Sequence, residues 1–397
     1  RSMMKKARIG LALSGGGTRA MAFHLGCLRA LHDLELIDQI EVVSTVSGGS
    51  VIGGLFAANR DPFSEFEKRV RGHLSQGFLR PAITKAFTTT EGLRALYCWA
   101  ILVPTNLLII FVASAASSLS LFLTPEKRKD WRLEKLHSPF RRFASRTTIL
   151  RRVFEDDLFM GLRLRDLPKE APLLIVNAAE MRTGSAFYFS QRSSGTWRIG
   201  ELADRDVSLA HAVTASAAYP LLLPALDEVL PFNTKDGSRR EERVILTDGG
   251  TYDNLGLAPL WPDRDPRISL NVTKVDTIIC CRAGYGLRFD PPTQFLLARM
   301  KSVFFSIFDR TENAATKRLF DLVEAGKLKG VIMPYLGQND SRLACAPDDL
   351  VTREEAYAYP TDFSAMSDEW IEKLSKRGEQ LTRALIAEHL PHLIKVD

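Results

Sequence analysis

Ser47 and Asp248 are the two residues whose types and surroundings could catalyse acyl transfer. Ser47 lies in the segment TVSGG at 45–49, which has the pattern of a nucleophile elbow, a sharp strand-to-helix turn that lifts a serine hydroxyl out of a sheet. Thr45 stands where the first glycine of that pattern is usual. A serine nucleophile needs a base. Asp248 ends an apolar segment and precedes two glycines that let the backbone turn into a site, so it is the candidate base.

A glycine-rich segment, SGGGTR at 14–19, could stabilise the oxyanion of such a reaction. Glycine carries no side chain, so its N–H group can approach a reacting carbonyl, and such donors commonly make the largest catalytic contribution. An arginine at the start of the following helix would add a positive field. The predicted oxyanion hole is Gly15, Gly16, Gly17 and Arg19, and the glycines that shape the two other turns are Gly48, Gly49, Gly249 and Gly250.

Two other functions use a glycine-rich turn between a strand and a helix, because such a turn can hold an anion. A P-loop ends in Gly-Lys-Ser/Thr, but Gly17 is followed by Thr-Arg. A dinucleotide-binding turn has the pattern GxGxxG/A, which 15–20 satisfies, but it also needs an acidic residue at the end of the second strand, where this chain has TVS. A Ser-His-Asp triad is a further alternative. It is disfavoured because His24 and His211 fall within predicted helices, where structural roles are expected.

Strands and helices that alternate along the first sixty residues must position these motifs. The apolar segments 8–13 and 41–46 predict buried strands, and 18–34 and 50–58 predict helices. Each strand leads through a glycine turn into a helix, which indicates the start of a parallel α/β sheet. Later strands are expected at 173–179, 186–190, 243–246 and 275–281, and later helices at 63–74, 208–218, 295–328 and 365–393.

Together the motifs resemble those of the patatin-like phospholipases, whose catalytic core is shared with the cytosolic phospholipase A2 group. The resemblance rests on SGGGTR at 14–19, TVSGG at 45–49 and DGG at 248–250, and on a small-residue block ending in proline, ASAAYP at 215–220. It covers about 7–75 and 170–285. It implies an α/β fold, specifically a patatin-like three-layer α/β/α arrangement with a mostly parallel central sheet.

The resemblance also implies a Ser-Asp dyad, in which Asp248 takes the proton of Ser47. The expected reaction is hydrolysis of a fatty acyl ester through an acyl-serine intermediate, by a phospholipase A or lysophospholipase without metal or cofactor. An acyltransferase that uses the same dyad and a non-catalytic membrane adaptor of the same fold are the alternatives. The expected domains are a catalytic domain at 7–285, interrupted by a hydrophobic and basic insertion at 91–160, and a mostly helical C-terminal extension at 286–397 that packs on the core.

The insertion contains an apolar segment, 95–123, within a stretch that has no charged residue between Arg94 and Glu126. It is long enough to cross a bilayer, which takes about 20 residues. Three interpretations stay open: a transmembrane or re-entrant helix, a hairpin that enters one leaflet or lines an acyl-chain channel, and a buried pair of core helices. Trp99 near one end is typical of a membrane interface.

A basic segment follows, with ten Lys or Arg against three acidic residues between positions 126 and 152. This surplus exceeds the net charge of +6 of the whole chain. Nucleic acid is a conceivable partner for such a patch, but the adjoining apolar segment favours an anionic membrane surface. The candidate membrane-binding residues are Trp99, Lys127, Arg128, Lys129, Arg141, Arg142, Arg151 and Arg152.

The five cysteines are scattered, with no Cys-x-x-Cys, which indicates neither a zinc ribbon nor a disulfide framework and favours a reducing compartment. We therefore expect a membrane-associated protein on the cytoplasmic side that acts on a phospholipid or another acyl lipid. The sequence predicts no nucleic-acid partner. It leaves open whether a protein activator is needed.

Overall fold

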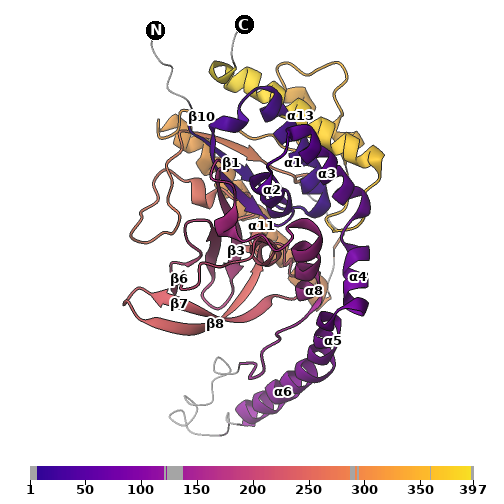
Figure 1. Ribbon diagram of the computed structural model, residues 1–397, viewed down its shortest axis with the longest axis vertical. Coiled ribbons are helices and arrows are strands. Elements are labelled where there is room, and N and C mark those ends of the chain that lie inside the picture. The colour runs from indigo at the N-terminus through magenta and orange to yellow at the C-terminus, as the bar shows by residue number, and fades with distance from the viewer. Residues whose placement is uncertain are drawn as a thin grey trace.

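A ten-stranded sheet runs through the centre of the protein (Figure 1). The structure is a computed structural model that describes residues 7–119, 122, 137–286, 291–292, 295–357 and 359–394. The order of the strands is β10-β9-β1-β2-β3-β4-β5-β6-β7-β8. Their bounds are β1 Ile9–Leu13, β2 Ile40–Val46, β3 Leu173–Glu180, β4 Ser185–Ser190, β5 Gly195–Thr196, β6 Gly200–Leu202, β7 Leu226–Thr234, β8 Arg239–Asp248, β9 Thr277–Cys281 and β10 Gly330–Ile332.

The sheet has a parallel part and an antiparallel part that meet at β3. Strands β10, β9, β1, β2 and β3 are parallel, whereas every pairing from β3 through β8 is antiparallel. β8 also pairs with the C-terminal half of β3, which closes β3–β8 into a barrel-like unit.

The prediction of a mostly parallel sheet is therefore wrong, although the α/β class is correct. The reason is the length of the connections. Four of the five links between β3 and β8 are only three or four residues long, which allows hairpins but not parallel crossovers. The one long link, 203–225, carries α9 and still returns the chain antiparallel to β6. The parallel arrangement holds in the part that carries the ends of β1 and β2, where the first two glycine turns lie.

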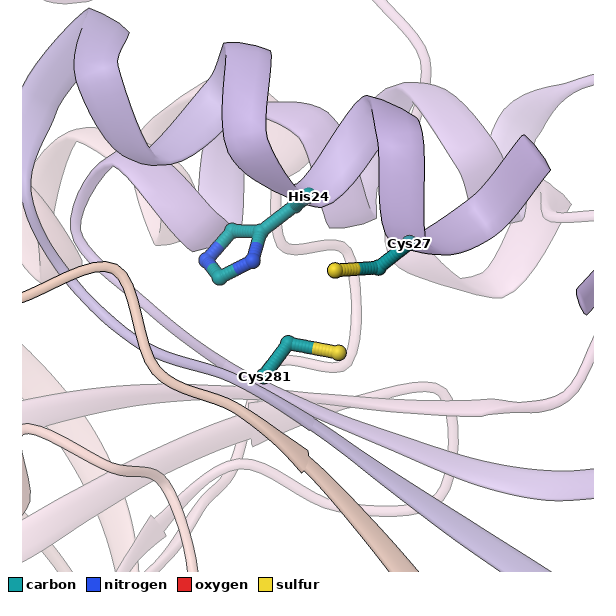
Figure 2. A group of neighbouring side chains, drawn as sticks. All are labelled: His24, Cys27 and Cys281. Carbon is teal, nitrogen blue, oxygen red and sulfur yellow. The ribbon is translucent and has the colours of Figure 1, made fainter. Parts of the chain in front are cut away.

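The parallel strands separate two hydrophobic cores, because successive side chains of a strand point to opposite faces. Leu13 and Cys281 lie in the first core, and Ala12 and Cys280 lie in the second. Cys281 points toward α1, where it lies beside two residues of that helix (Figure 2). Helices α1 Gly17–Asp33, α2 Gly48–Ala58, α3 Phe63–Gln76, α9 Leu209–Ser216 and α13 Asp368–His389 contribute to the first core, and α11 Leu296–Glu324 contributes to the second.

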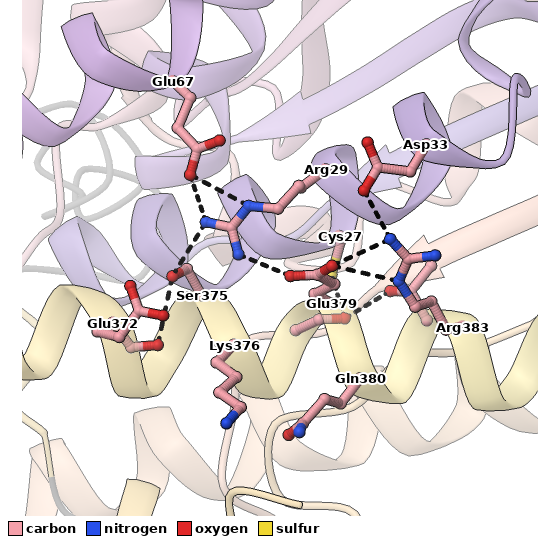
Figure 3. Close-up of polar contacts among 12 residues, drawn as sticks. Cys27, Arg29, Asp33, Glu67, Glu372, Ser375, Lys376, Glu379, Gln380 and Arg383 are labelled. Atoms are coloured by element: carbon pink, nitrogen blue, oxygen red, sulfur yellow. Dashed lines mark hydrogen bonds and ion pairs between the residues drawn. The ribbon is translucent and has the colours of Figure 1, made fainter. Parts of the chain in front are cut away.

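Helices α1 and α13 cross at very close range. A Cβ atom on Gly26 would lie 1.7 Å from the Ser375 carbonyl oxygen, and one on Gly378 would lie 2.2 Å from the carbonyl oxygen of Phe23. Arg29 of α1 adds ion pairs with Glu67 of α3 and with Glu379 of α13 (Figure 3). The C-terminal helix is thus held directly against the helix that follows the first glycine turn.

The insertion forms a helical arm that extends away from the body (Figure 1). The arm consists of α4 Leu79–Thr88, which precedes the predicted insertion, and of α5 Thr90–Tyr97, a π-helical turn Cys98–Leu102 and α6 Val103–Leu119. The helical stretch Thr90–Leu119 is long and apolar enough to cross a membrane, and very little of its apolar part is buried. The interpretation as a buried pair of core helices is therefore wrong. The remaining α-helices in the described part of the chain are α8 Arg146–Val153, α10 Gly250–Asp253 and α12 Arg353–Ala356.

Candidate active site

Ser47 occupies the sharp turn between β2 and α2. Its backbone has φ 52° and ψ −121°, a conformation that costs a non-glycine residue about 1–3 kcal/mol and is concentrated at functional sites. The turn is packed under the first glycine-rich segment, since a Cβ on Gly48 would lie 2.1 Å from the Gly17 carbonyl oxygen. A Cβ on Gly49 would similarly lie 2.3 Å from the carbonyl oxygen of Leu13. The two glycines are therefore required for the elbow to lie this close to its neighbour.

Thr45, the departure from the usual elbow pattern, is accommodated by a glycine on the following helix. A Cβ atom on Gly53 would lie only 2.4 Å from the Cγ2 atom of Thr45, so a larger residue at position 53 would clash with this threonine. The Thr45 hydroxyl also accepts a hydrogen bond of 2.9 Å from the Ser50 hydroxyl. The threonine is thus built into the packing of α2 on β2.

Asp248 ends β8 and lines the same cavity as Ser47. One carboxylate oxygen, Oδ1, accepts the Gly250 N–H at 2.7 Å, whereas Oδ2 is buried and has no hydrogen-bond partner within the described residues. Burial raises the pKa of the carboxyl to about 6, against the lowering effect of the nearby Ser47 hydroxyl and the Gly250 N–H. The serine hydroxyl is thus near enough to influence the carboxyl without a hydrogen bond of standard geometry, as is common before a substrate binds.

Ser216, the last residue of α9, connects the candidate nucleophile and base. Its hydroxyl accepts the Ser47 N–H at 2.9 Å, and its carbonyl accepts the Gly249 N–H at 3.3 Å. The carbonyl of Ala218 accepts the Asp248 N–H at 3.1 Å. The small-residue block at 215–220 therefore fixes both turns relative to each other.

The first glycine-rich segment supplies two unoccupied donors. Gly16 and Gly17 have φ values of 143° and 61°, and within the described part of the chain their N–H groups make no hydrogen bond. The N–H of Gly15 donates to the Asn254 carbonyl at 3.2 Å. The prediction that Gly15 contributes to the oxyanion hole therefore needs correction, because its N–H group is already hydrogen-bonded. The N–H groups of Gly16 and Gly17 remain available.

Arg19 lines the cavity beside these donors. Its guanidinium tip lies 3.2 Å from the position of a Cβ on Gly16. It donates to the carbonyls of Ala283, at 2.9 Å, and Tyr359, at 3.2 Å. Burial lowers the pKa of Arg19, against the raising effect of Tyr285 and Glu312 nearby. The arginine is held rigidly by backbone carbonyls, so it presents a fixed positive group to the cavity.

The cavity has a volume of about 280 Å³ and combines these polar groups with an aromatic wall. Phe304, Phe305 and Phe308 of α11 form the wall, with Leu222 nearby. The α11 helix also begins with strongly exposed apolar side chains, namely Phe295, Leu296, Leu297, Met300, Val303 and Ile307. The same helix therefore carries both the aromatic wall of the cavity and an exposed apolar surface.

The candidate membrane-binding residues divide into exposed, paired and undescribed ones. Trp99 is 64% exposed on the arm. Arg151 pairs with Glu228 at 3.1 Å and Arg152 with Asp156 at 3.0 Å, while Arg141 donates to the carbonyl of Asp227. Arg142 is partly buried, and burial lowers its pKa. Lys127, Arg128 and Lys129 lie outside the described residues.

Two arginines in the C-terminal half of the predicted basic segment, Arg151 and Arg152, are thus paired with acidic residues outside that segment. Acidic residues beyond 126–152, on β7 and just after α8, neutralise arginines that a local charge count leaves unpaired.

The two histidines considered for a triad lie away from the cavity, whose described lining contains neither. His211 pairs with Glu228 at 2.7 Å. His24 is fully buried with its Nε2 atom 2.8 Å from the Ser14 carbonyl oxygen. His24 lies with Cys27 and Cys281 in the one group of three potential metal ligands found among the described residues.

Sequence reasoning missed the contributions of α11 and of the C-terminal segment to the site. The backbone carbonyl oxygen of Asp362 accepts the Thr18 N–H at 2.9 Å. A Cβ atom on Gly17 would lie 2.2 Å from this oxygen. The aromatic cluster FFSIF at 304–308 was a readable signal, since three of its side chains recur on one helical face. The segment around Asp362 carries no motif, so no signal in the sequence pointed to it.

Comparison with known proteins gives likenesses in both sequence and structure. A family model described as patatin-like phospholipase matches residues 11–261. The solved structure of human GIVD cytosolic phospholipase A2 is similar with a TM-score of 0.53 at 12% identity, covering 98% of this chain and 62% of that one. The same human enzyme in complex with methyl γ-linolenyl fluorophosphonate gives a TM-score of 0.51 at 13% identity, covering 98% of this chain and 59% of that one.

VipD from Legionella pneumophila is similar at 15% identity with a TM-score of 0.40, covering 97% of this chain and 67% of that one. This chain therefore spans about three fifths to two thirds of the length of the solved proteins it matches. The human structures support the fold, and the family model covers more than half of the chain. This protein accordingly belongs to the patatin-like phospholipase family, as its motifs predicted.

Proposed function

We propose that this protein hydrolyses fatty acyl esters of lipids with a Ser47–Asp248 dyad, through an acyl-serine intermediate. The observation that carries the proposal is the meeting of three features in one cavity: a serine at φ 52°, a buried carboxyl with an unpartnered oxygen, and two unoccupied N–H donors. Each feature alone has structural explanations. Their convergence is what acyl transfer requires.

In the proposed reaction Asp248 Oδ2 accepts the proton of Ser47 as Oγ attacks the ester carbonyl carbon. The N–H groups of Gly16 and Gly17 donate to the resulting oxyanion, and Arg19 adds positive charge beside them. Asp248 then returns the proton to the departing alcohol, which leaves an acyl-serine. A water molecule, deprotonated by Asp248, releases the fatty acid and restores the serine. A carboxyl with a pKa of about 6 is ionised at neutral pH and can perform both proton transfers.

The proposed substrate is an acyl lipid because the cavity has an aromatic wall that suits a hydrocarbon chain. The exposed apolar start of α11 adjoins this wall, and the apolar arm offers a second surface of the same kind. Removing such surfaces from water contributes roughly 25 cal/mol per Å². We propose that both contact the membrane that delivers the substrate.

The chemical proposal is tested with a fluorophosphonate probe and with phospholipid vesicles. Wild type should be labelled on Ser47 and should release fatty acid. Ser47→Ala should lose both, while Ser193→Ala, in a distant hairpin turn, should keep both. Fatty-acid release by Ser47→Ala at the wild-type rate would overturn the proposal. Transfer of the acyl group to an added alcohol in preference to water would identify a transferase instead.

The membrane proposal is tested by polar substitution on the arm. Leu107 and Phe111 are 62% and 71% exposed, so changing both to serine should not disturb the core. The double variant should bind anionic vesicles more weakly and hydrolyse vesicle lipid more slowly, with unchanged turnover of a short soluble ester. Ile268→Ser, at an exposed apolar residue of a separate loop, is the control. Equal loss in the control, or unchanged vesicle binding by the arm variant, would contradict the proposal.

A further inference from the structure

Three side chains with soft or borderline metal-binding atoms meet in the first core, directly behind the first glycine-rich segment (Figure 2). His24 and Cys27 lie one turn apart on α1, and Cys281 ends β9. All three residues are fully buried, and their potential ligand atoms lie within 4.8 Å of one another. The proposed ester hydrolysis uses none of them.

The orientation of the His24 ring is fixed from one side. Its Nε2 atom lies 2.8 Å from the Ser14 carbonyl oxygen, which can only accept a hydrogen bond, so Nε2 carries the proton. In a neutral ring Nδ1 then has a free lone pair. Nδ1 is buried without a hydrogen-bond partner within the described residues, and the ring edge that carries it faces the two sulfur atoms (Figure 2).

An unsatisfied buried acceptor is costly, on the order of 1–3 kcal/mol, so it calls for a partner. The arrangement matches the usual surroundings of a metal-bound histidine, which donates its second ring N–H to a backbone carbonyl or a carboxylate.

We propose that His24 Nδ1, Cys27 Sγ and Cys281 Sγ bind a thiophilic closed-shell metal ion, Zn²⁺ or Cu⁺. Binding replaces the two thiol protons, which pass to solvent, and forms one metal–nitrogen and two metal–sulfur bonds. Bond lengths of about 2.0 Å to nitrogen and 2.3 Å to sulfur place ligand atoms roughly 3.5–4 Å apart. The cluster therefore needs to contract by only about 1 Å.

Charge and coordination number separate the two ions. Zn²⁺ with two thiolates and a neutral imidazole has no net charge, which suits a site without solvent. Cu⁺ leaves one negative charge, but it is a softer ion that suits thiolate ligands, and the described residues offer three ligands rather than the four that structural zinc usually takes. Both ions use the same three atoms, so one set of variants tests the site and the choice of ion is an outcome.

The position of the ion gives it a structural role. The Ser14 N–H donates to the Cys281 carbonyl at 3.1 Å, and the Ser14 hydroxyl accepts the Ala283 N–H at 2.8 Å. Ser14 is thus already tied to β9, and an ion on His24 and Cys281 adds a link between α1 and the same strand. It would fix the start of the glycine turn from behind without touching the cavity.

The test measures tightly bound metal in purified protein, with a neighbouring cysteine as the matched control. Cys27→Ala and Cys281→Ala each remove a ligand, whereas Cys280→Ala removes an equally buried thiol from the opposite face of the same strand. Protein is desalted, and metal is counted by mass spectrometry. It is then refolded without oxygen in excess Zn²⁺ or Cu⁺, desalted and counted again, because a buried site fills most readily during folding.

We expect about one ion per chain in wild type and in Cys280→Ala, and less than a tenth of that in Cys27→Ala and Cys281→Ala. Refolding with Co²⁺ should give a thiolate-to-metal charge-transfer band only where both cysteines remain. Circular dichroism and Ser47 labelling identify variants that fold. Wild type that stays empty after refolding in both ions, equal binding by all folded variants, or a Cys27–Cys281 disulfide found in peptide maps would overturn the proposal.

Discussion

Replacement of Asp248 by asparagine should abolish catalysis and stabilise the fold at neutral pH. The residue is 2% exposed, and burial raises the pKa of its carboxyl from 3.8 to about 6, although Ser47 and the Gly250 N–H act in the opposite direction. A shift of about two units means that folding disfavours the ionised form by on the order of 3 kcal/mol. An uncharged amide of nearly the same shape avoids this cost.

The expected stabilisation has a defined pH window. Because the pKa in the folded state is higher than in the unfolded state, wild type is not penalised below pH 3.8 and loses stability as the pH rises through about 6. The advantage of Asp248→Asn should therefore be absent at pH 3.5, grow between pH 4 and pH 6, and be complete at pH 8. The size worked out above is an upper limit, since the amide must also fit against Ser47.

Two measurements check this prediction. Urea unfolding of both proteins at several pH values gives the difference in unfolding free energy. Turnover of a short soluble ester should be about 10²–10⁴-fold lower in the variant, because an amide cannot accept the serine proton. Wild-type turnover should itself fall as the pH drops below about 6, where the carboxyl becomes protonated.

Asp253→Asn is the matched control, because burial raises the pKa of Asp253 to about 6 as well. Its two carboxylate oxygens accept N–H groups from Gly256 and Ala258, so an amide nitrogen there would face a donor. This control should therefore gain clearly less stability at pH 8 than Asp248→Asn does. An Asp248→Asn variant that keeps wild-type turnover, or that is no more stable than wild type at pH 8, would refute the reasoning about Asp248.

Three further predictions concern the packing around the site. Gly17→Ala should lower ester turnover by about 10²–10³-fold, because the added carbon displaces an oxyanion donor, whereas Gly161→Ala, also at positive φ but in open space, should leave turnover unchanged. Ser216→Ala should lower kcat with little change in KM, since it leaves the Ser47 N–H unsatisfied, and steady-state kinetics on a soluble ester measure this. Gly378→Ala should lower the melting temperature by forcing α1 and α13 apart, whereas Gly72→Ala, with open space around it on α3, should hold or raise it.

The sequence determined the local turns and hence the candidate nucleophile, base and family. The short motifs around Ser47 and Asp248 could be recognised because a nucleophile elbow or an Asp-Gly-Gly turn is specified by neighbouring residues. The first strands and helices were equally readable, since their apolar periodicity is a local property. The elbow could be recognised despite Thr45 in place of the usual glycine. The reason that a threonine fits there, the absence of a side chain at Gly53, lies on the next helix.

Which polar groups already have partners depends on the fold and cannot be worked out from the sequence. Gly15 cannot be distinguished from Gly16 and Gly17 in the sequence, but its N–H donates a hydrogen bond to the carbonyl of Asn254, more than two hundred residues later. The pairing of Arg151 with Glu228 likewise cannot be counted from a local segment. Hydrogen bonds and ion pairs depend on distance in space, and folding sets that distance largely independently of separation along the chain.

The antiparallel half of the sheet and the cluster of His24, Cys27 and Cys281 have the same origin. Strand direction follows from how each connection crosses the sheet, and single strand patterns do not contain this information. Cys281 faces α1 because its strand, β9, pairs with β1, the strand that leads into α1. This pairing brings together segments more than 260 residues apart. Neighbouring residues thus specify the chemistry of each turn, whereas long-range strand pairing determines which of these groups come together.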